Sequence, residues 1–151
     1  DWSKAIDTLR DAQRLLVIGR GAGFAIAQEA ALKFKETSTL QAEAFSSAEV
    51  RHGPMALIDE NYPLLIFAPR GVEQAGLLTL ARDMRQRGAR VLLAAPDDVA
   101  ERDLTLSQAA HPDLDPILAI QSFYVMAAAL AEARGLDPDQ PRFLSKVTRT
   151  H

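Results

Sequence analysis

Three charged residues in the segment 28–36 stand three and four positions apart: Glu29, Lys33 and Glu36. In a helix, at about 100° per residue, they fall within roughly 60° of one another on one face. A carboxylate with a cation one turn away can be held ionised, as a general base requires. The same spacing also describes an ordinary ion pair on a solvated helix face, worth about 0.2–0.5 kcal/mol. The pattern alone therefore leaves a catalytic base and a surface ion pair open.

Two further side chains suited to proton transfer or covalent chemistry lie elsewhere in the chain. His52 is one of three histidines and precedes Gly53-Pro54, which must interrupt any helix. An imidazole transfers protons near neutral pH, although a lone loop histidine is more commonly a surface residue. Lys146 lies in a polar C-terminal tail, where a lysine is ordinarily solvated. Either residue acts chemically only if the fold carries it to a shared site.

Gly19, Gly21 and Gly23 follow a short apolar run and precede a helical pattern. A dinucleotide-binding turn would have its third glycine at position 24, where this chain has Phe24, and the Lys-Ser/Thr pair of a P-loop is missing from the turn. A turn that merely needs small residues for packing explains the glycines as well. An anion at the N-terminus of the following helix is physically reasonable. Gly19 and Gly21 are therefore candidate substrate contacts, together with Ser145 on the tail.

The elements that would position these residues alternate along the chain. Short apolar runs bounded by Gly or Pro predict buried strands, at residues 15–18, 41–45, 64–68 and 91–95, with a weak edge strand near 104–106. Periodic apolar patterns predict helices, at residues 2–11, 24–38, 72–87 and 114–134, whereas residues 46–58 are ambiguous. Strands that alternate with helices pair in parallel through right-handed crossovers. The sequence therefore predicts an α/β fold: a three-layer αβα sandwich with a doubly wound, flavodoxin-like parallel sheet of about five strands.

In doubly wound folds, ligands bind beyond the carboxyl ends of the strands. We therefore expect one rim of the domain to be bordered by residues 19–23, by residues 46–54 and by the loops after Ala68 and Ala95. His52 and the glycine turn would both lie on this rim.

The composition limits the kind of protein. With 151 residues, 48% of them hydrophobic, the chain is long enough for one compact domain. The lack of Cys excludes disulfides and thiolate sites, and a net charge of −3 without a basic run argues against nucleic acid as the main partner. No apolar stretch approaches the length of roughly 20 residues that a membrane span needs. We therefore expect a cytoplasmic domain that uses no membrane, metal or cofactor.

Four ordered blocks of the chain resemble the second sugar isomerase (SIS) domain of the glutamine–fructose-6-phosphate aminotransferase family. They are residues 27–36, 42–45, 51–58 and 139–142, the last followed by Leu144 and Lys146. The resemblance implies the SIS fold and proton transfer between C1 and C2 of an open-chain sugar phosphate. It also implies a preceding SIS domain, so that residues 1–151 form one SIS domain, the C-terminal half of a two-domain module.

The same resemblance assigns roles to individual residues. Glu36 matches the base of the proton transfer, with Glu29 and Lys33 as supporting neighbours. His52 matches the histidine that opens the sugar ring, which an adjacent subunit contributes, and a homodimer is therefore expected. Lys146 matches the lysine that forms a Schiff base with the substrate carbonyl.

The chain also departs from the family. The turn at residues 19–28 lacks the Ser and Thr of the phosphate-binding loop, which belongs to the first SIS domain. Nothing resembles a glutaminase domain, and residues 46–51 and 145–150 look more like those of glucosamine-6-phosphate deaminases. We expect part of an enzyme that couples aldose–ketose isomerisation of glucosamine 6-phosphate or fructose 6-phosphate to amino transfer or deamination at C2, with deamination preferred. Two alternatives are a non-catalytic sugar-phosphate-binding SIS module of a regulator, and a structural half that dimerises through helix 114–134.

Overall fold

One parallel sheet organises residues 1–144, the part of the chain that the computed structural model describes. The strand order is β2-β1-β3-β4-β5, and neighbouring strands are parallel throughout. The strands are β1 (Arg14–Gly19), β2 (Gln41–Ser46), β3 (Pro63–Phe67), β4 (Arg90–Ala95) and β5 (Leu104–Thr105). The helices are α1 (Ser3–Leu9), α2 (Ala22–Ser38), α3 (Gln74–Gln86) and α4 (Asp115–Ala133), with the 3-10 turns η1 (Glu49–His52), η2 (Pro54–Leu57) and η3 (Pro112–Leu114).

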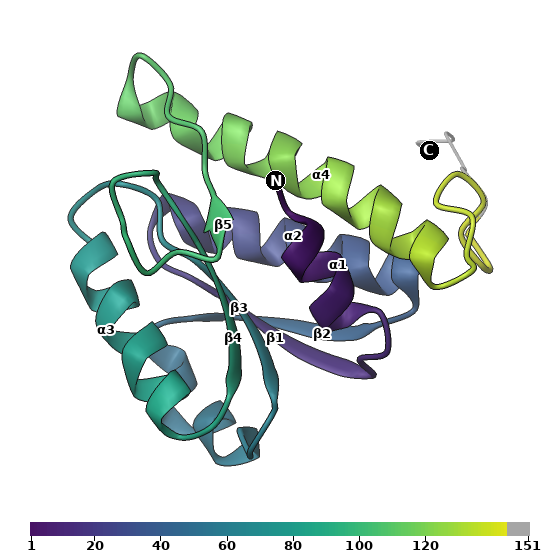
Figure 1. Ribbon diagram of the computed structural model, residues 1–151, viewed down its shortest axis with the longest axis horizontal. Coiled ribbons are helices and arrows are strands. Elements are labelled where there is room, and N and C mark those ends of the chain that lie inside the picture. Colours follow the sequence, from purple (N-terminus) through teal and green to yellow (C-terminus); the bar gives the residue numbers. More distant parts are fainter. Residues whose placement is uncertain (145–151) are drawn as a thin grey trace, which may run out of the picture.

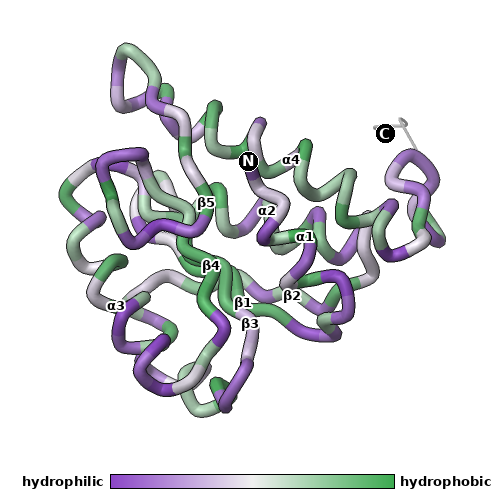
Figure 2. The backbone as a smooth tube through the Cα atoms, viewed as in Figure 1, coloured by the Kyte–Doolittle hydropathy of each residue, from purple (hydrophilic) through white to green (hydrophobic). Residues whose placement is uncertain are grey.

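Helices cover both faces of the sheet: α1, α2 and α4 lie on one side and α3 on the other (Figure 1). Successive strand residues point to opposite faces. On β1, Leu15 and Val17 pack in the core beneath α2 and α4, whereas Leu16 and Ile18 pack in the core beneath α3. Since both faces of β1, β3 and β4 are buried, these strands are near-continuous hydrophobic runs, and they form the apolar centre of the molecule (Figure 2).

The predicted fold class is confirmed. The chain runs from β1 outward to β2, returns past β1 to β3, and then continues to the opposite edge, which is the flavodoxin-like order. Each predicted strand and helix begins and ends within two residues of its expected position.

Residues 46–58, which the sequence leaves ambiguous, form η1 and η2. The Ser46 hydroxyl accepts a hydrogen bond from the Glu49 amide (3.2 Å), and the Glu49 carboxylate accepts one from the Ser46 amide (3.0 Å). This reciprocal pair has the hydrogen-bond pattern of a capping box and closes the turn between β2 and η1. The hydrogen bonds from Ser46 also hold the pKa of Glu49 below its ordinary value. Gly53, with φ of 147°, then separates the two turns in a conformation that favours glycine.

α4 is unusually apolar. The segment Pro112–Ala133 spans 22 residues and contains an 18-residue stretch with a mean hydropathy of 1.5, so it is long and apolar enough to cross a membrane, contrary to the expectation that no stretch comes close. In the fold, its inner residues Ala119, Phe123 and Ala127 are buried in the same core as α2 and the sheet. Packing in this core accounts for part of the apolar composition; the outer side of α4 is apolar as well, with Ile117 60% and Val125 72% exposed.

Arg134, directly after α4, fixes the ends of two other helices. Its guanidinium donates hydrogen bonds to the carbonyl oxygen of Ser38 at the end of α2 (2.9 Å), and to those of Leu9, Arg10 and Ala12 around the end of α1 (2.6–3.1 Å). A cation is favourable at helix C-termini, where the last carbonyl groups lack partners. Arg134 thus holds the carboxyl end of α2, the end that carries Glu36.

Candidate functional site

The three charged residues of α2 lie together on its outer face. The Lys33 Nζ atom is 2.6 Å from Glu36 Oε2 and 3.6 Å from Glu29 Oε1. All three side chains are about one-third exposed. The hydrogen bond with Glu36 raises the pKa of Lys33; partial burial lowers it, but the Glu29 and Glu36 charges act with the hydrogen bond. Lys33 is therefore a persistent cation beside the carboxylate that the resemblance assigns as the base.

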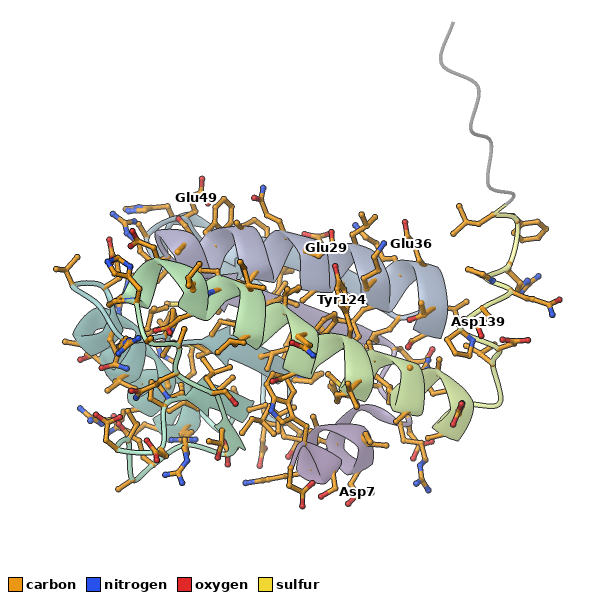
Figure 3. All side chains as sticks on the ribbon, turned by 90° about the horizontal axis from the view of Figure 1, so that it is seen from above. Asp7, Glu29, Glu36, Glu49, Tyr124 and Asp139 are labelled. Atoms are coloured by element: carbon orange, nitrogen blue, oxygen red, sulfur yellow. The ribbon has the colours of Figure 1, made fainter. Side chains whose placement is uncertain are left out.

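The packing of α2 explains why this face points outward. Its opposite side is buried, at Ile26, Ala27, Ala30, Ala31 and Phe34. The Phe34 ring meets the Phe123 ring of α4 edge to face, with centroids 5.1 Å apart. Because this apolar side is fixed against α4 and the sheet, Glu29 and Glu36 are held along one edge of the α2–α4 pair (Figure 3). Lys33 contacts both carboxylates.

α4 adds a polar residue that the sequence did not indicate. The Tyr124 hydroxyl donates a hydrogen bond to Glu29 Oε1 (2.9 Å), and in Figure 3 its ring points from α4 toward Glu29. This hydrogen bond, followed by partial burial, raises the pKa of Tyr124, so the phenol stays protonated. The two residues are 95 positions apart, and no local spacing could have paired them.

A cavity of about 510 Å³ opens at the carboxyl end of α2. Glu36 and Lys35 line it on the helix side, and residues 142–144 line it on the side of the tail. Ser145 and Lys146, the candidate substrate contact and the candidate Schiff-base lysine, lie outside the described residues. The last described residue, Leu144, borders the same cavity as Glu36, the candidate base. Ser145 and Lys146 follow Leu144 directly in the sequence.

His52 lies elsewhere. It is exposed at the end of η1, six residues beyond the carboxyl end of β2, on the rim where we expected it. α2 begins at this rim and runs back along the sheet for 17 residues, about 25 Å. Figure 3 shows Glu49, the first residue of η1, near one end of α2 and Glu36 near the other. Within one chain, the structure therefore does not bring His52 and Glu36 together.

The glycine turn is explained by close backbone packing. A Cβ atom on Gly19 would lie 2.1 Å from the Gly23 carbonyl oxygen, so no larger residue fits. Gly21 has φ of 54°, and a Cβ atom there would lie 3.2 Å from the carboxylate of Glu73. This carboxylate places negative charge beside the N-terminus of α2, where a bound phosphate would also have to lie. The role of Gly19 and Gly21 as substrate contacts stays a prediction.

Within residues 1–144, no three His, Asp or Glu side chains gather as a metal site would require. The geometry defines this chain as a doubly wound α/β domain in which a charged helix face lies beside a cavity. This arrangement is suited to acid–base chemistry on a small polar substrate. Comparison with known families then gives the particular family. The family model of the SIS domain matches residues 8–133, and the chain therefore belongs to the SIS-domain family.

Named relatives agree with this assignment. The chain is 36% identical over 143 residues to the glutamine–fructose-6-phosphate aminotransferase of Chlorobaculum tepidum, covering 91% of this chain and 23% of that protein. It resembles the solved C-terminal domain of glucosamine-fructose-6-phosphate aminotransferase from Francisella tularensis, with TM-score 0.81 and 29% identity over 91% of this chain and 40% of that one. It also resembles glucosamine-6-phosphate deaminase from Thermotoga maritima, with TM-score 0.71 and 27% identity over 94% of this chain and 43% of that one. The chain thus spans about a quarter of the curated relative and less than half of each solved chain.

Proposed function

We propose that this chain is the C-terminal SIS domain of an enzyme that isomerises hexose 6-phosphates and adds or removes nitrogen at C2, with release of ammonia from glucosamine 6-phosphate preferred. One observation carries the proposal: Glu36, which is paired with Lys33, borders a cavity whose other side is formed by residues 142–144 of the tail that leads to Lys146. A module that only binds sugar phosphates needs neither a base nor a Schiff-base amine, so the combination favours an enzyme.

In the proposed reaction, Glu36 removes the C2 proton of the open-chain aldose and a proton is returned to C1. The C1–C2 double bond formed in between becomes a C2=N bond, and its nitrogen is then lost as ammonia. Lys33 holds the Glu36 carboxylate in place for this transfer. Lys146 would attack the C2=N carbon, expel ammonia and form its Schiff base at C2, which water then hydrolyses to fructose 6-phosphate and the free amine. His52 would move protons during ring opening.

Two partners complete the proposal. A preceding SIS domain would supply the phosphate site, because the turn at residues 19–28 has no Ser or Thr and faces the Glu73 carboxylate. A second copy of the protein would supply His52, because η1, which ends at His52, begins at Glu49 near one end of α2, whereas Glu36 lies near the other end. The coverage of the solved relatives, 40–43% of each chain, supports a module about twice the length of this one.

The test is ammonia release from glucosamine 6-phosphate by the two-domain parent protein. We expect Glu36→Gln to lower kcat about 100-fold or more, because proton transfer by a positioned base contributes about that factor. Glu132→Gln, at an exposed glutamate on α4, is the matched control and should leave kcat unchanged. Full activity of the Glu36→Gln variant would remove Glu36 from the role of base.

Borohydride trapping separates the enzyme from the regulator module. Reduction during turnover should leave a covalent sugar adduct on Lys146, identified by peptide mass spectrometry. Binding of the sugar phosphate without turnover and without an adduct would support the regulator instead. Adding glutamine or ammonia to fructose 6-phosphate in the same assay determines whether the nitrogen is released or acquired.

A further inference from the structure

Tyr124 links α4 to the charged face of α2. Its hydroxyl donates to Glu29 Oε1 at 2.9 Å, and the same Oε1 atom is the carboxylate oxygen that lies 3.6 Å from Lys33 Nζ. The Lys33 ammonium in turn contacts Glu36 Oε2 at 2.6 Å. The hydroxyl, two carboxylates and ammonium therefore form one chain of polar contacts that ends at the candidate base.

The two carboxylates compete for one cation. Glu29 and Glu36 both carry negative charge within reach of Lys33, and Lys33 lies closer to Glu36 by 1.0 Å. The hydrogen bond from Tyr124 satisfies Glu29 Oε1 and disperses part of its charge. Without it, Glu29 Oε1 would be free to turn toward Lys33 and draw the ammonium away from Glu36.

We propose that Tyr124 is a positioning residue for the reaction: by donating its hydroxyl to Glu29, it keeps the Lys33 ammonium on Glu36. This inference rests on the proposed function of Glu36 as the base. Tyr124 acts through Glu29 and Lys33, so its loss affects the chemical step more than substrate binding. The phenol keeps its proton, as its raised pKa indicates, so it remains a donor over the working pH range.

The kinetic test uses Tyr124→Phe in the two-domain parent, which removes the hydroxyl and keeps the ring in place beside Phe123. We expect kcat for glucosamine 6-phosphate to fall about fivefold with KM unchanged, the factor that corresponds to about 1 kcal/mol for one net hydrogen bond. Tyr62→Phe changes the chain's other tyrosine, buried in the core beneath α3, and is the matched control. An unchanged kcat, or a change confined to KM, would overturn the inference.

A double-mutant cycle shows whether Tyr124 acts through Glu29. In the Glu29→Gln background the charge that competes for Lys33 is gone, so adding Tyr124→Phe should have no further effect on kcat. The same fivefold loss in both backgrounds would mean that Tyr124 serves only the packing of α4.

A crystal structure of the Tyr124→Phe parent tests the arrangement without turnover. We expect the Lys33 Nζ atom to contact Glu29 in place of Glu36. If Nζ stays on Glu36, the inference is wrong whatever the activity. If Nζ moves but the unmodified parent releases no ammonia, or if Glu36→Gln is fully active, the fault lies in the proposed reaction and the positioning of Lys33 stands.

Discussion

Lys33 is an amine in the candidate site, and its surroundings determine what it can do. The hydrogen bond with Glu36, assisted by the charges of Glu29 and Glu36, raises its pKa against the opposing effect of burial. An ammonium has no lone pair with which to attack a carbonyl. Lys33 is therefore suited to orienting a carboxylate, and covalent chemistry needs another amine, the role proposed for Lys146.

Asp115, at the first position of α4, is a second residue whose environment carries a prediction. It is 5% exposed, accepts hydrogen bonds from Arg70 Nε (2.6 Å) and Nη2 (3.0 Å), and accepts another from the Ala109 amide (2.7 Å). Burial raises its pKa, but the Arg70 guanidinium and the Ala109 amide outweigh this effect, and the net pKa is lowered. These contacts between Arg70, Asp115 and Ala109 join the loop after β3 to the start of α4.

Asp115→Asn should destabilise the domain in a pH-dependent way. A lowered pKa in the folded state contributes stability that is present above the unfolded pKa of about 3.9 and is lost as the pH falls through the folded value. Urea unfolding at pH 7 should therefore show that the variant loses about 2 kcal/mol in the free energy of unfolding. The difference in this free energy between the variant and the unmodified chain should become smaller below about pH 4. Asp113→Asn, at an exposed neighbour, is the control and should cost almost nothing. A difference in the free energy of unfolding that stays constant down to pH 3 would contradict the lowered pKa of Asp115.

At the scale of elements, α2 is held at three places: its buried side against α4, its first turn against the glycines, and its end by Arg134. The four carbonyl groups that Arg134 serves belong to the ends of α1 and α2, far away in the sequence. Since Glu36 lies two residues before the end of α2, the position of this end determines where the candidate base points.

Arg134→Met keeps most of the apolar stem and removes the donors. We expect a loss of about 2–3 kcal/mol in the free energy of unfolding, because hydrogen bonds to a charged group are stronger than neutral ones. Chemical denaturation with unchanged m-value measures the loss. Arg87→Met, at an exposed residue after α3, provides the comparison and should cost less than about 0.5 kcal/mol. If both variants lost the same free energy of unfolding, the hydrogen bonds from Arg134 to the carbonyl groups would add nothing to the stability.

Elements and contacts differ in how far the sequence reveals them. Buried strands such as β1 and β3 are apolar on both faces, so short hydrophobic runs located them and the parallel order followed from the helices between them. The sequence leaves residues 46–58 ambiguous because Gly53-Pro54 interrupts any helix there, although Ser46 and Glu49 have the spacing of a capping box. The contacts of Tyr124 and Arg134 span about 95 residues or more, and no local pattern contains such pairings.

At the scale of the whole molecule, the separation of His52 from Glu36 is the decisive feature. One lies on the rim at the carboxyl ends of the strands, and the other at the far end of a helix about 25 Å long. No side-chain rotation spans such a distance. If both residues serve one reaction, as the resemblance implies, each site must combine Glu36 of one chain with His52 of another.

A mixed dimer of the parent protein tests this directly. Glu36→Gln and His52→Asn homodimers should both be inactive. A heterodimer of the two variants, purified through two different tags, contains one site with neither substitution and one site with both. We therefore expect it to recover about half of the specific activity of the unmodified dimer, measured as ammonia release.

The control is a heterodimer of Glu36→Gln with the Glu36→Gln/His52→Asn double variant, which has no intact Glu36 and should stay inactive in any arrangement. An inactive first heterodimer would mean that Glu36 and His52 must come from the same chain. That result would contradict the site shared between two chains, because one of the two sites in the heterodimer should then carry neither substitution and be active.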